Sequence, residues 1–347
     1  MILRIKYCLF APVLMGIILM TSFSANANFS IKNNDGIITL SNGLDLRLSV
    51  APEHGGEISG IQVKNNHQWH ELIHRGNDYS KQKGWRGKSQ LLWPATGPTL
   101  ANGFEFKNKK LGNYLLESKL YDMPFHGFAK DQVWTFEHQL ISDDKAQVTL
   151  SISDTDLSRK FYPFKFKLSV TYTLFTSHFE ATYKVHADKS NTFAMPFSIG
   201  NHITFKAPLI AGGKLQDFMF ESFSQKQLVK DQQKFPTGAV INSPYLGKNK
   251  LADLPERQSV SLTQENNKPS IKLIDPSGLV LTLSHQASKL PENLTIQYNL
   301  WASIEQGFIS PEPWVGSQNS LNSGLGLIKL KPSENWTWTL DFSVEQN

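Results

Sequence analysis

The sequence predicts an all-β protein, folded as one large antiparallel β-sandwich in a single domain. Through most of the chain apolar residues alternate with polar ones at a period of two, which is the spacing of half-buried strands. No segment shows a helical stripe longer than two turns, and no repeat or low-complexity linker divides the 347 residues. All-β proteins of this length often form one domain, and so many long strands favour a sandwich over a small barrel.

Each expected strand rests on its own alternation. The longest runs from Phe164 to Leu174, where aromatic and aliphatic residues alternate with lysine, serine and threonine. Its pattern resumes after Thr176-Ser177, which predicts an antiparallel hairpin, and Asp275–Gly278 has good turn chemistry between two further strands. The strands are expected at residues 37–40, 44–50, 57–63, 134–140, 148–152, 164–174, 179–185, 271–274, 279–283 and 338–344.

The first residues resemble a secretory signal peptide. Arg4 and Lys6 precede a nearly apolar run, Cys8–Met20, and an A-x-A cleavage site ends at Ala27. The apolar run is shorter than the roughly 20 residues of a membrane span, so no stable membrane anchor is expected. We therefore predict a signal peptide over residues 1–27, a domain over 28–347, and a periplasmic or secreted protein. The single cysteine leaves with the signal.

The charge of the chain does not point to nucleic acid. The formal net charge of +5 falls by two once Arg4 and Lys6 are removed, and the remaining lysines are scattered. Scattered charge is typical of a solvated surface, whereas a nucleic-acid site needs a clustered basic patch. We expect no nucleic-acid partner.

Three segments carry residues suited to acid–base chemistry on a neutral polar ligand. His126-Gly127 stands near the start of a strand, where glycine lets the backbone approach a ligand closely. His202 follows Asn201 in a second strand-like segment. Glu312 lies between two prolines that hold the backbone extended, and Trp314 follows it.

Taken together, the motifs of the chain resemble the aldose 1-epimerase (galactose mutarotase-like) family. The similarity runs from the Gly55–Ile58 strand to the end of the chain. It rests on five motifs in the family's order: Leu91–Gly97, His126–Ala129 with Asp131 and Trp134, Asn201–Phe205, Phe235–Gly238, and Glu312–Trp314. The resemblance implies a large antiparallel β-supersandwich, in agreement with the strand pattern.

The resemblance also implies roles in mutarotation, the interconversion of sugar anomers through ring opening, which needs one base, one acid and no cofactor or metal. It implies that Glu312 is the base at O1 and His202 the acid at O5, with a pKa close to its unperturbed value. The partner is a small-molecule sugar, either a hexose or the end of an oligosaccharide. The expected substrate-binding residues are His126, Trp314, Trp93, Arg86, Asn201 and Lys130, with the two tryptophans stacking on the sugar.

The chain departs from the family where arginine is usual. Pro98 stands after the Leu91–Gly97 motif, and Lys130 follows His126–Ala129. Lysine keeps the charge but loses the bidentate fork. Arg86 is the candidate replacement. The departures bear on which sugar is bound, and they argue against a phosphorylated hexose, which favours an arginine cluster.

Alternatives remain open from sequence alone. The scaffold could belong to a sugar-binding protein without catalysis, or to a polysaccharide-processing enzyme, because a fold does not fix a function. A hydrolase needs two facing carboxylates, and the motifs supply one. His67, His70, His74 and Glu71 have metal-ligand spacing only if they form a helix, and we expect no metal.

Overall fold

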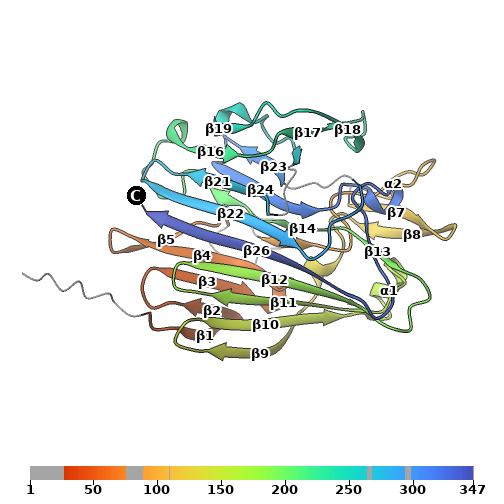
Figure 1. The fold of residues 1–347 in the computed structure, drawn as a ribbon, viewed down its shortest axis with the longest axis horizontal. Coiled ribbons are helices and arrows are strands. Elements are labelled where there is room, and N and C mark those ends of the chain that lie inside the picture. The colour runs from red at the N-terminus through yellow and green to blue at the C-terminus, as the bar shows by residue number, and fades with distance from the viewer. Residues whose placement is uncertain (1–26, 76–88, 109, 264–267, 294–297, 347) are drawn as a thin grey trace, which may run out of the picture.

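The computed structural model describes residues 27–75, 89–108, 110–263, 268–293 and 298–346. The expected signal peptide therefore lies outside the described residues except for Ala27, and Arg86 lies outside them as well. Three large antiparallel sheets make up the molecule (Figure 1). The predicted all-β, single-domain fold is confirmed.

The largest sheet has nine strands, and the C-terminal strand β26 lies at its centre. Phe179 and Phe342 face each other across β12 and β26, with ring centroids 4.5 Å apart, a cross-strand pair of the kind that fixes register. In sheet order the strands are β19 (Gly247–Lys250), β16 (Met219–Ser222), β21 (Ser270–Ile274), β22 (Leu279–Ala287), β26 (Asn335–Gln346), β12 (His178–Ala187), β11 (Phe166–Leu174), β10 (Ala146–Ser153) and β9 (Thr135–Ile141).

Two further sheets lie side by side. The five-stranded sheet contains β1 (Ser30–Asn34), β2 (Ile37–Ser41), β3 (Leu46–Ala51), β4 (Glu57–Asn65) and β5 (Gln68–Glu71). The eight-stranded sheet contains β18 (Pro236–Asn242), β17 (Lys226–Lys230), β20 (Val260–Thr263), β23 (Tyr298–Ser303), β24 (Phe308–Val315), β14 (Ile199–His202), β6 (Gln90–Leu92) and, paired only with β24, β15 (Phe205–Lys206).

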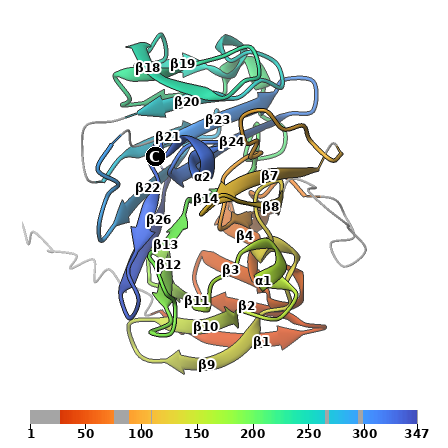
Figure 2. The ribbon, with the colours of Figure 1, turned by 90° about the vertical axis from the view of Figure 1, so that its right-hand side faces the viewer.

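The nine-stranded sheet forms one layer and the other two sheets form the second (Figure 2). Buried hydrogen bonds join the layers. The Tyr172 hydroxyl donates to the Gly56 carbonyl at 2.6 Å, and the Asn201 amide donates to the Tyr183 hydroxyl at 3.2 Å. The inward residues of β11, β12 and β26 fill the space between with apolar side chains. Alternation in the sequence thus becomes a core between two layers.

The remaining elements are short. Two two-stranded sheets complete the fold: the hairpin of β7 (Leu111–Leu116) with β8 (Lys119–Pro124), and the long-range pair of β13 (Met195–Phe197) with β25 (Ile328–Leu330). The helices are α1 (Ser158–Phe161), α2 (Ser320–Ser323) and 3-10 turns at Pro52–His54, Ala129–Asp131, Leu215–Asp217 and Leu251–Asp253. Within the described ranges, no helix is long and apolar enough to cross a membrane.

Strand β24 is central, yet it contains two prolines. It pairs with β14 only through Trp314 and Val315, and with β15 only through Phe308 and Ile309. Pro311 and Pro313 therefore lie where β24 has no ladder partner on that side, and their missing N–H groups cost no sheet hydrogen bond there. The two prolines hold β24 extended, and the gap in its pairing on that side falls at Glu312.

Candidate active site

Five polar side chains lie next to one another across neighbouring strands of the eight-stranded sheet. Gln90 pairs with His202, Glu312 with Asn299, and Asn299 with Ser261. Directly opposite residues of an antiparallel pair share a face of the sheet. We call this set the polar row: Gln90, His202, Glu312, Asn299 and Ser261.

The centre of the polar row is a histidine–carboxylate pair. Gly200 pairs with Trp314 across β14 and β24, so His202 falls beside Glu312 two positions further along. His202 Nε2 lies 3.6 Å from Glu312 Oε1. The two residues that the sequence predicts as acid and base are thus brought together by sheet register.

The Glu312 carboxylate is held by two donors in a nearly closed environment. Its side chain is 2% exposed. Asn299 Nδ2 donates to Oε1 at 3.3 Å, and Trp314 Nε1 donates to Oε2 at 3.2 Å. Burial raises the pKa of Glu312 well above its usual value, while these hydrogen bonds and the charge of Lys230 oppose the rise. A buried carboxylate of raised pKa is a stronger base than an exposed one.

His202 lies at the open end of this pair. Its side chain is 12% exposed, and the rings of His126 and Trp301 each meet it edge-on with centroids 5.7 Å away. Burial lowers the pKa of His202 to about 4. The expectation of a pKa near the unperturbed value is therefore wrong, because the imidazole loses water on entering the site.

His126 is fixed by its backbone and by a hydrogen bond. Its φ of 65° and that of 68° at Gly127 are left-handed, and a Cβ on Gly127 would lie 2.0 Å from the Trp93 carbonyl oxygen, so only glycine fits there. The Gly97 N–H donates to His126 Nδ1 at 3.1 Å. Burial lowers the pKa of His126 to about 3, so the ring is neutral and its proton sits on Nε2. His126 thus offers one N–H donor.

The two tryptophans expected to stack on a sugar lie elsewhere. Trp93 is fully buried among core rings, with Phe166 at 4.5 Å and Tyr162 at 5.5 Å. Trp314 is 1% exposed and its indole covers Gly200, where a Cβ would lie 2.5 Å from Trp314 Cδ1. Both stacking predictions are wrong, because neither ring presents a face to a ligand. Trp314 instead orients Glu312.

Asn201 also differs from expectation, whereas the substrate contact expected of Lys130 stays a prediction. Asn201 is buried between the layers, where it accepts from the Ser89 hydroxyl at 2.6 Å, since its side chain points to the face opposite that of His202. It supports β14 and does not reach the site. Lys130 donates to the Gly127 carbonyl at 3.0 Å and pairs with Asp131, and its charge acts on His126. Arg86 lies outside the described residues.

The structure adds residues that the motifs do not include. Trp301 is half-buried beside His202, and Asn299 binds Glu312. Both belong to the segment Tyr298–Trp301, in which Asn299 and Trp301 alternate with buried Tyr298 and Leu300. This alternation was the sequence signal that could have placed Asn299 and Trp301 on one face of a strand. The third added residue is Lys230, whose charge acts on Glu312. Its nearness to Glu312 follows from the tertiary structure, and no motif in the sequence indicates it.

Metal-ligand groupings occur away from the polar row. Residues 68–71 form strand β5, so the helical spacing that His67, His70 and His74 would need is not present. Within the described residues, one trio brings ligand atoms within 4.8 Å of one another, namely His178, Glu180 and Asp341 of β12 and β26. Lys268 already pairs with Asp341 at 3.6 Å.

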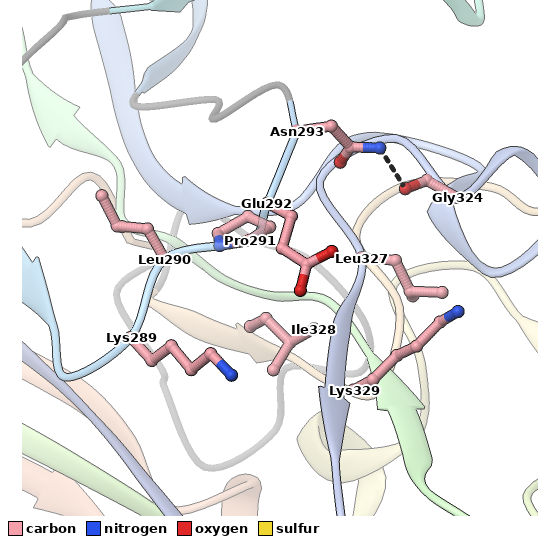
Figure 3. A pocket seen from close by; sticks show the side chains of 9 residues that line it. All are labelled: Lys289, Leu290, Pro291, Glu292, Asn293, Gly324, Leu327, Ile328 and Lys329. Atoms are coloured by element: carbon pink, nitrogen blue, oxygen red, sulfur yellow. Dashed lines mark hydrogen bonds between the residues drawn. The ribbon is translucent and has the colours of Figure 1, made fainter.

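A separate cavity lies between the segments 289–293 and 324–329 (Figure 3). It measures about 290 Å³ and is lined by two lysines, one glutamate and apolar side chains. Asn293 closes one side by donating to the Gly324 carbonyl at 3.2 Å. None of its lining residues belongs to the polar row, and it holds no histidine.

Comparison with known proteins gives a consistent result. A family model described as aldose 1-epimerase matches residues 36–343. Two proteins of Lactococcus lactis subsp. lactis, the chromosomal and plasmid forms of Protein LacX, are each 25% identical over 307 residues, which covers 83% of this chain and 91% of theirs.

Solved structures share the fold. A galactose mutarotase-like protein from Clostridium acetobutylicum superposes with a TM-score of 0.74 at 19% identity, covering 93% of this chain and 99% of that one. A galactose 1-epimerase from Lactobacillus acidophilus NCFM gives a TM-score of 0.68 at 17% identity, covering 93% and 100%.

Proposed function

We propose that this chain, which belongs to the aldose 1-epimerase family, is a mutarotase that opens and recloses the ring of a free sugar at its anomeric carbon. The observation that carries the proposal is the His202–Glu312 pair, with Nε2 and Oε1 3.6 Å apart at a part-exposed point of the sheet. An acid and a base at this separation can contact O5 and O1 of one pyranose.

In ring opening, one proton leaves the anomeric oxygen O1 and another is delivered to the ring oxygen O5. The Glu312 carboxylate takes the proton of the anomeric hydroxyl as the C1–O5 bond breaks. The electron pair of that bond stays on O5, which takes a proton from the His202 imidazolium. Opening thus converts carboxylate and imidazolium into carboxylic acid and neutral imidazole, and C1 becomes an aldehyde. After rotation about C1–C2, the same steps in reverse close the ring on the other face.

The site electrostatics support this proton cycle. Burial raises the pKa of Glu312 and lowers that of His202 to about 4, so the carboxylic acid and neutral imidazole form is favoured. That is the form produced by ring opening. The hydrogen bonds from Asn299 and Trp314 favour the carboxylate that begins the cycle. These hydrogen bonds offset part of the rise that burial causes in the pKa of Glu312.

Two side chains next to the His202–Glu312 pair can bind the sugar. The Nε2–H of His126 can donate to a ring hydroxyl, because Nδ1 is occupied by the Gly97 N–H. Trp301 offers an apolar ring beside His202 on which the C–H face of a sugar can stack. Trp301 thus takes the part that the sequence suggested for Trp93 and Trp314.

Polarimetry of freshly dissolved α-D-galactose and α-D-glucose tests the proposal. We expect the purified protein to accelerate the approach to equilibrium, and both Glu312→Gln and His202→Ala to abolish the acceleration. A sugar-binding protein without catalysis would bind either sugar and accelerate neither. Acceleration that survives both substitutions would show that other residues do the chemistry.

We also propose that the protein is exported after cleavage behind Ala27. The support is the basic, apolar and small-residue order of residues 1–27. Fractionation of the expressing bacterium followed by N-terminal sequencing checks this. A mature chain that begins at Asn28 in the periplasm is expected, and an uncleaved chain in the cytoplasm would contradict it.

A further inference from the structure

A basic pocket opens beside Glu312, where two strands of the eight-stranded sheet separate. Strands β17 and β20 pair only at Lys226–Thr263 and Gln227–Leu262. Beyond that point they diverge and leave a cavity of about 520 Å³. The residues of its wall that matter here are Lys230, Lys234, Arg257, Gln258, Ser259 and Ser261.

The pocket wall shares residues with the site. The Ser261 hydroxyl donates to Asn299 Oδ1 at 3.0 Å, and Asn299 donates to Glu312. A chain of hydrogen bonds therefore runs from the pocket to the carboxylate that acts as base. The charges of Lys230 and Glu312 also act on each other. A sugar held at Glu312 thus has the pocket as its neighbour.

The charge in the pocket is unbalanced. Lys230, Lys234 and Arg257 contribute three cations to the wall, against one carboxylate, Asp231. Asp231 Oδ1 is engaged in its own turn, where it accepts from the Phe235 N–H at 2.9 Å. The charge of Lys234 acts unfavourably on Lys230. An anion placed between these cations would relieve their repulsion.

Lys230 has a donor left for such an anion. Its ammonium bridges the gap between the strands by donating to the Ser259 carbonyl at 3.0 Å and to the Ser259 hydroxyl at 2.6 Å. An ammonium carries three N–H groups, so one remains beyond these two bonds. Because Ser259 fixes the side chain, little side-chain entropy is lost when a ligand binds.

We propose that this pocket is an anion subsite that receives the carboxylate of an acidic sugar whose ring lies at His202 and Glu312. The inference rests on the proposed function, and it names the substrate class. The pocket lies on the Glu312 side of the pair, away from His202. A carboxylate on or beside the anomeric carbon therefore reaches it more directly than one on C5. The same position disfavours a hexose 6-phosphate, because its charged group also extends from C5.

Matched substrates test the assignment. D-Galactose and D-galacturonate differ only in the carboxylate at C6, and 3-deoxy-D-manno-octulosonate carries its carboxylate on the anomeric carbon. NMR exchange measurements give kcat/KM for each. We expect at least one acidic sugar to exceed galactose by tenfold or more, with octulosonate the stronger. Equal values for acidic and neutral sugars, or a higher value for glucose 6-phosphate than for both acids, would overturn the proposal.

Variants assign the effect to the pocket. Lys230→Met and Arg257→Gln should each reduce the preference for the acidic sugar at least fivefold. Lys248→Met removes one charge from the exposed face of β19 and should leave the preference unchanged. Thermal denaturation shows whether Lys230→Met, which removes a bridge between strands, still folds, and the exposed Arg257 gives an independent variant. A preference that persists in both pocket variants would contradict the assignment.

Calorimetry separates this inference from the proposed function. If no sugar shows accelerated mutarotation, the mutarotase proposal fails, yet binding still decides the subsite. Tenfold tighter binding of an acidic sugar than of galactose, lost in Lys230→Met and in Arg257→Gln, supports the subsite. Binding of equal strength overturns it.

Discussion

His202 and Glu312 face each other across two strands that pair through only two residues on each side. The side-chain atoms His202 Nε2 and Glu312 Oε1 are 3.6 Å apart, and the pairing of β24 on the β14 side is interrupted where two prolines flank Glu312. Trp314 closes the arrangement, since its ring covers Gly200 and its N–H binds the Glu312 carboxylate. Sheet register therefore brings His202 and Glu312 together, and the Trp314 side chain orients Glu312.

Trp314→Phe should lower kcat about tenfold with little change in KM, because it removes a hydrogen bond to a charged group while keeping an aromatic ring. Loss of that donor raises the pKa of Glu312 further, so the acid limb of the pH–rate profile should move to higher pH. Mutarotation rates from pH 4 to 9 check this. An unshifted profile would mean that the indole N–H does not tune the carboxylate.

Gly200→Ala should destabilise the protein by about 1–3 kcal/mol and lower activity with it, because the added Cβ lies 2.5 Å from Trp314 Cδ1. Combining it with Trp314→Ala should cost less than the sum of the two single changes, since alanine lacks the ring atoms that the added Cβ meets. Denaturant unfolding of all four proteins gives the coupling. If the two changes in unfolding free energy simply add, the side chains at positions 200 and 314 do not clash.

Glu312→Gln should stabilise the protein at alkaline pH. The pKa of Glu312 is raised in the folded state, so the wild-type carboxyl favours folding most below its unfolded value near 4.5, and this contribution is lost as pH rises towards the folded pKa. The neutral amide has no such loss. The advantage of the variant should grow above pH 4.5 by at most about 1.4 kcal/mol per pH unit.

Thermal denaturation at pH 5, 7 and 8 measures that difference. Glu345→Gln, which alters an exposed carboxylate near the end of β26, is the matched control and should show no such trend. Parallel curves for Glu312→Gln and the wild type would mean that Glu312 titrates as an exposed acid.

Trp301→Leu should raise KM about tenfold and leave stability nearly unchanged, because the ring is half-buried beside His202. Trp93→Leu should do the opposite, lowering stability by about 2–4 kcal/mol with KM unchanged, because Trp93 is fully buried among core rings. Kinetics and unfolding of the two variants together decide which indole meets the sugar. If only Trp93→Leu raised KM, Trp93 rather than Trp301 would be the indole that contacts the sugar.

The sequence by itself determined the fold and indicated the two residues that we propose as acid and base. Strict alternation, as in β11 and β12, can satisfy its apolar face only between two sheets, so the architecture followed from a local pattern. Short motifs also indicated His126, His202 and Glu312, because a left-handed His-Gly turn and a proline-flanked glutamate are themselves local features. The structure places these three residues together.

Only the tertiary structure decided which neighbours serve that pair. Whether an indole lies in the core, as Trp93 does, or beside a histidine, as Trp301 does, depends on how layers pack, and the residue type is the same in both cases. Asn201 and His202 are adjacent in sequence, yet they point to opposite faces of one strand. Lys230 reaches the neighbourhood of Glu312 because β17 and β20 diverge. Long-range packing and burial, which set these positions and the pKa values, depend on contacts between residues distant in sequence.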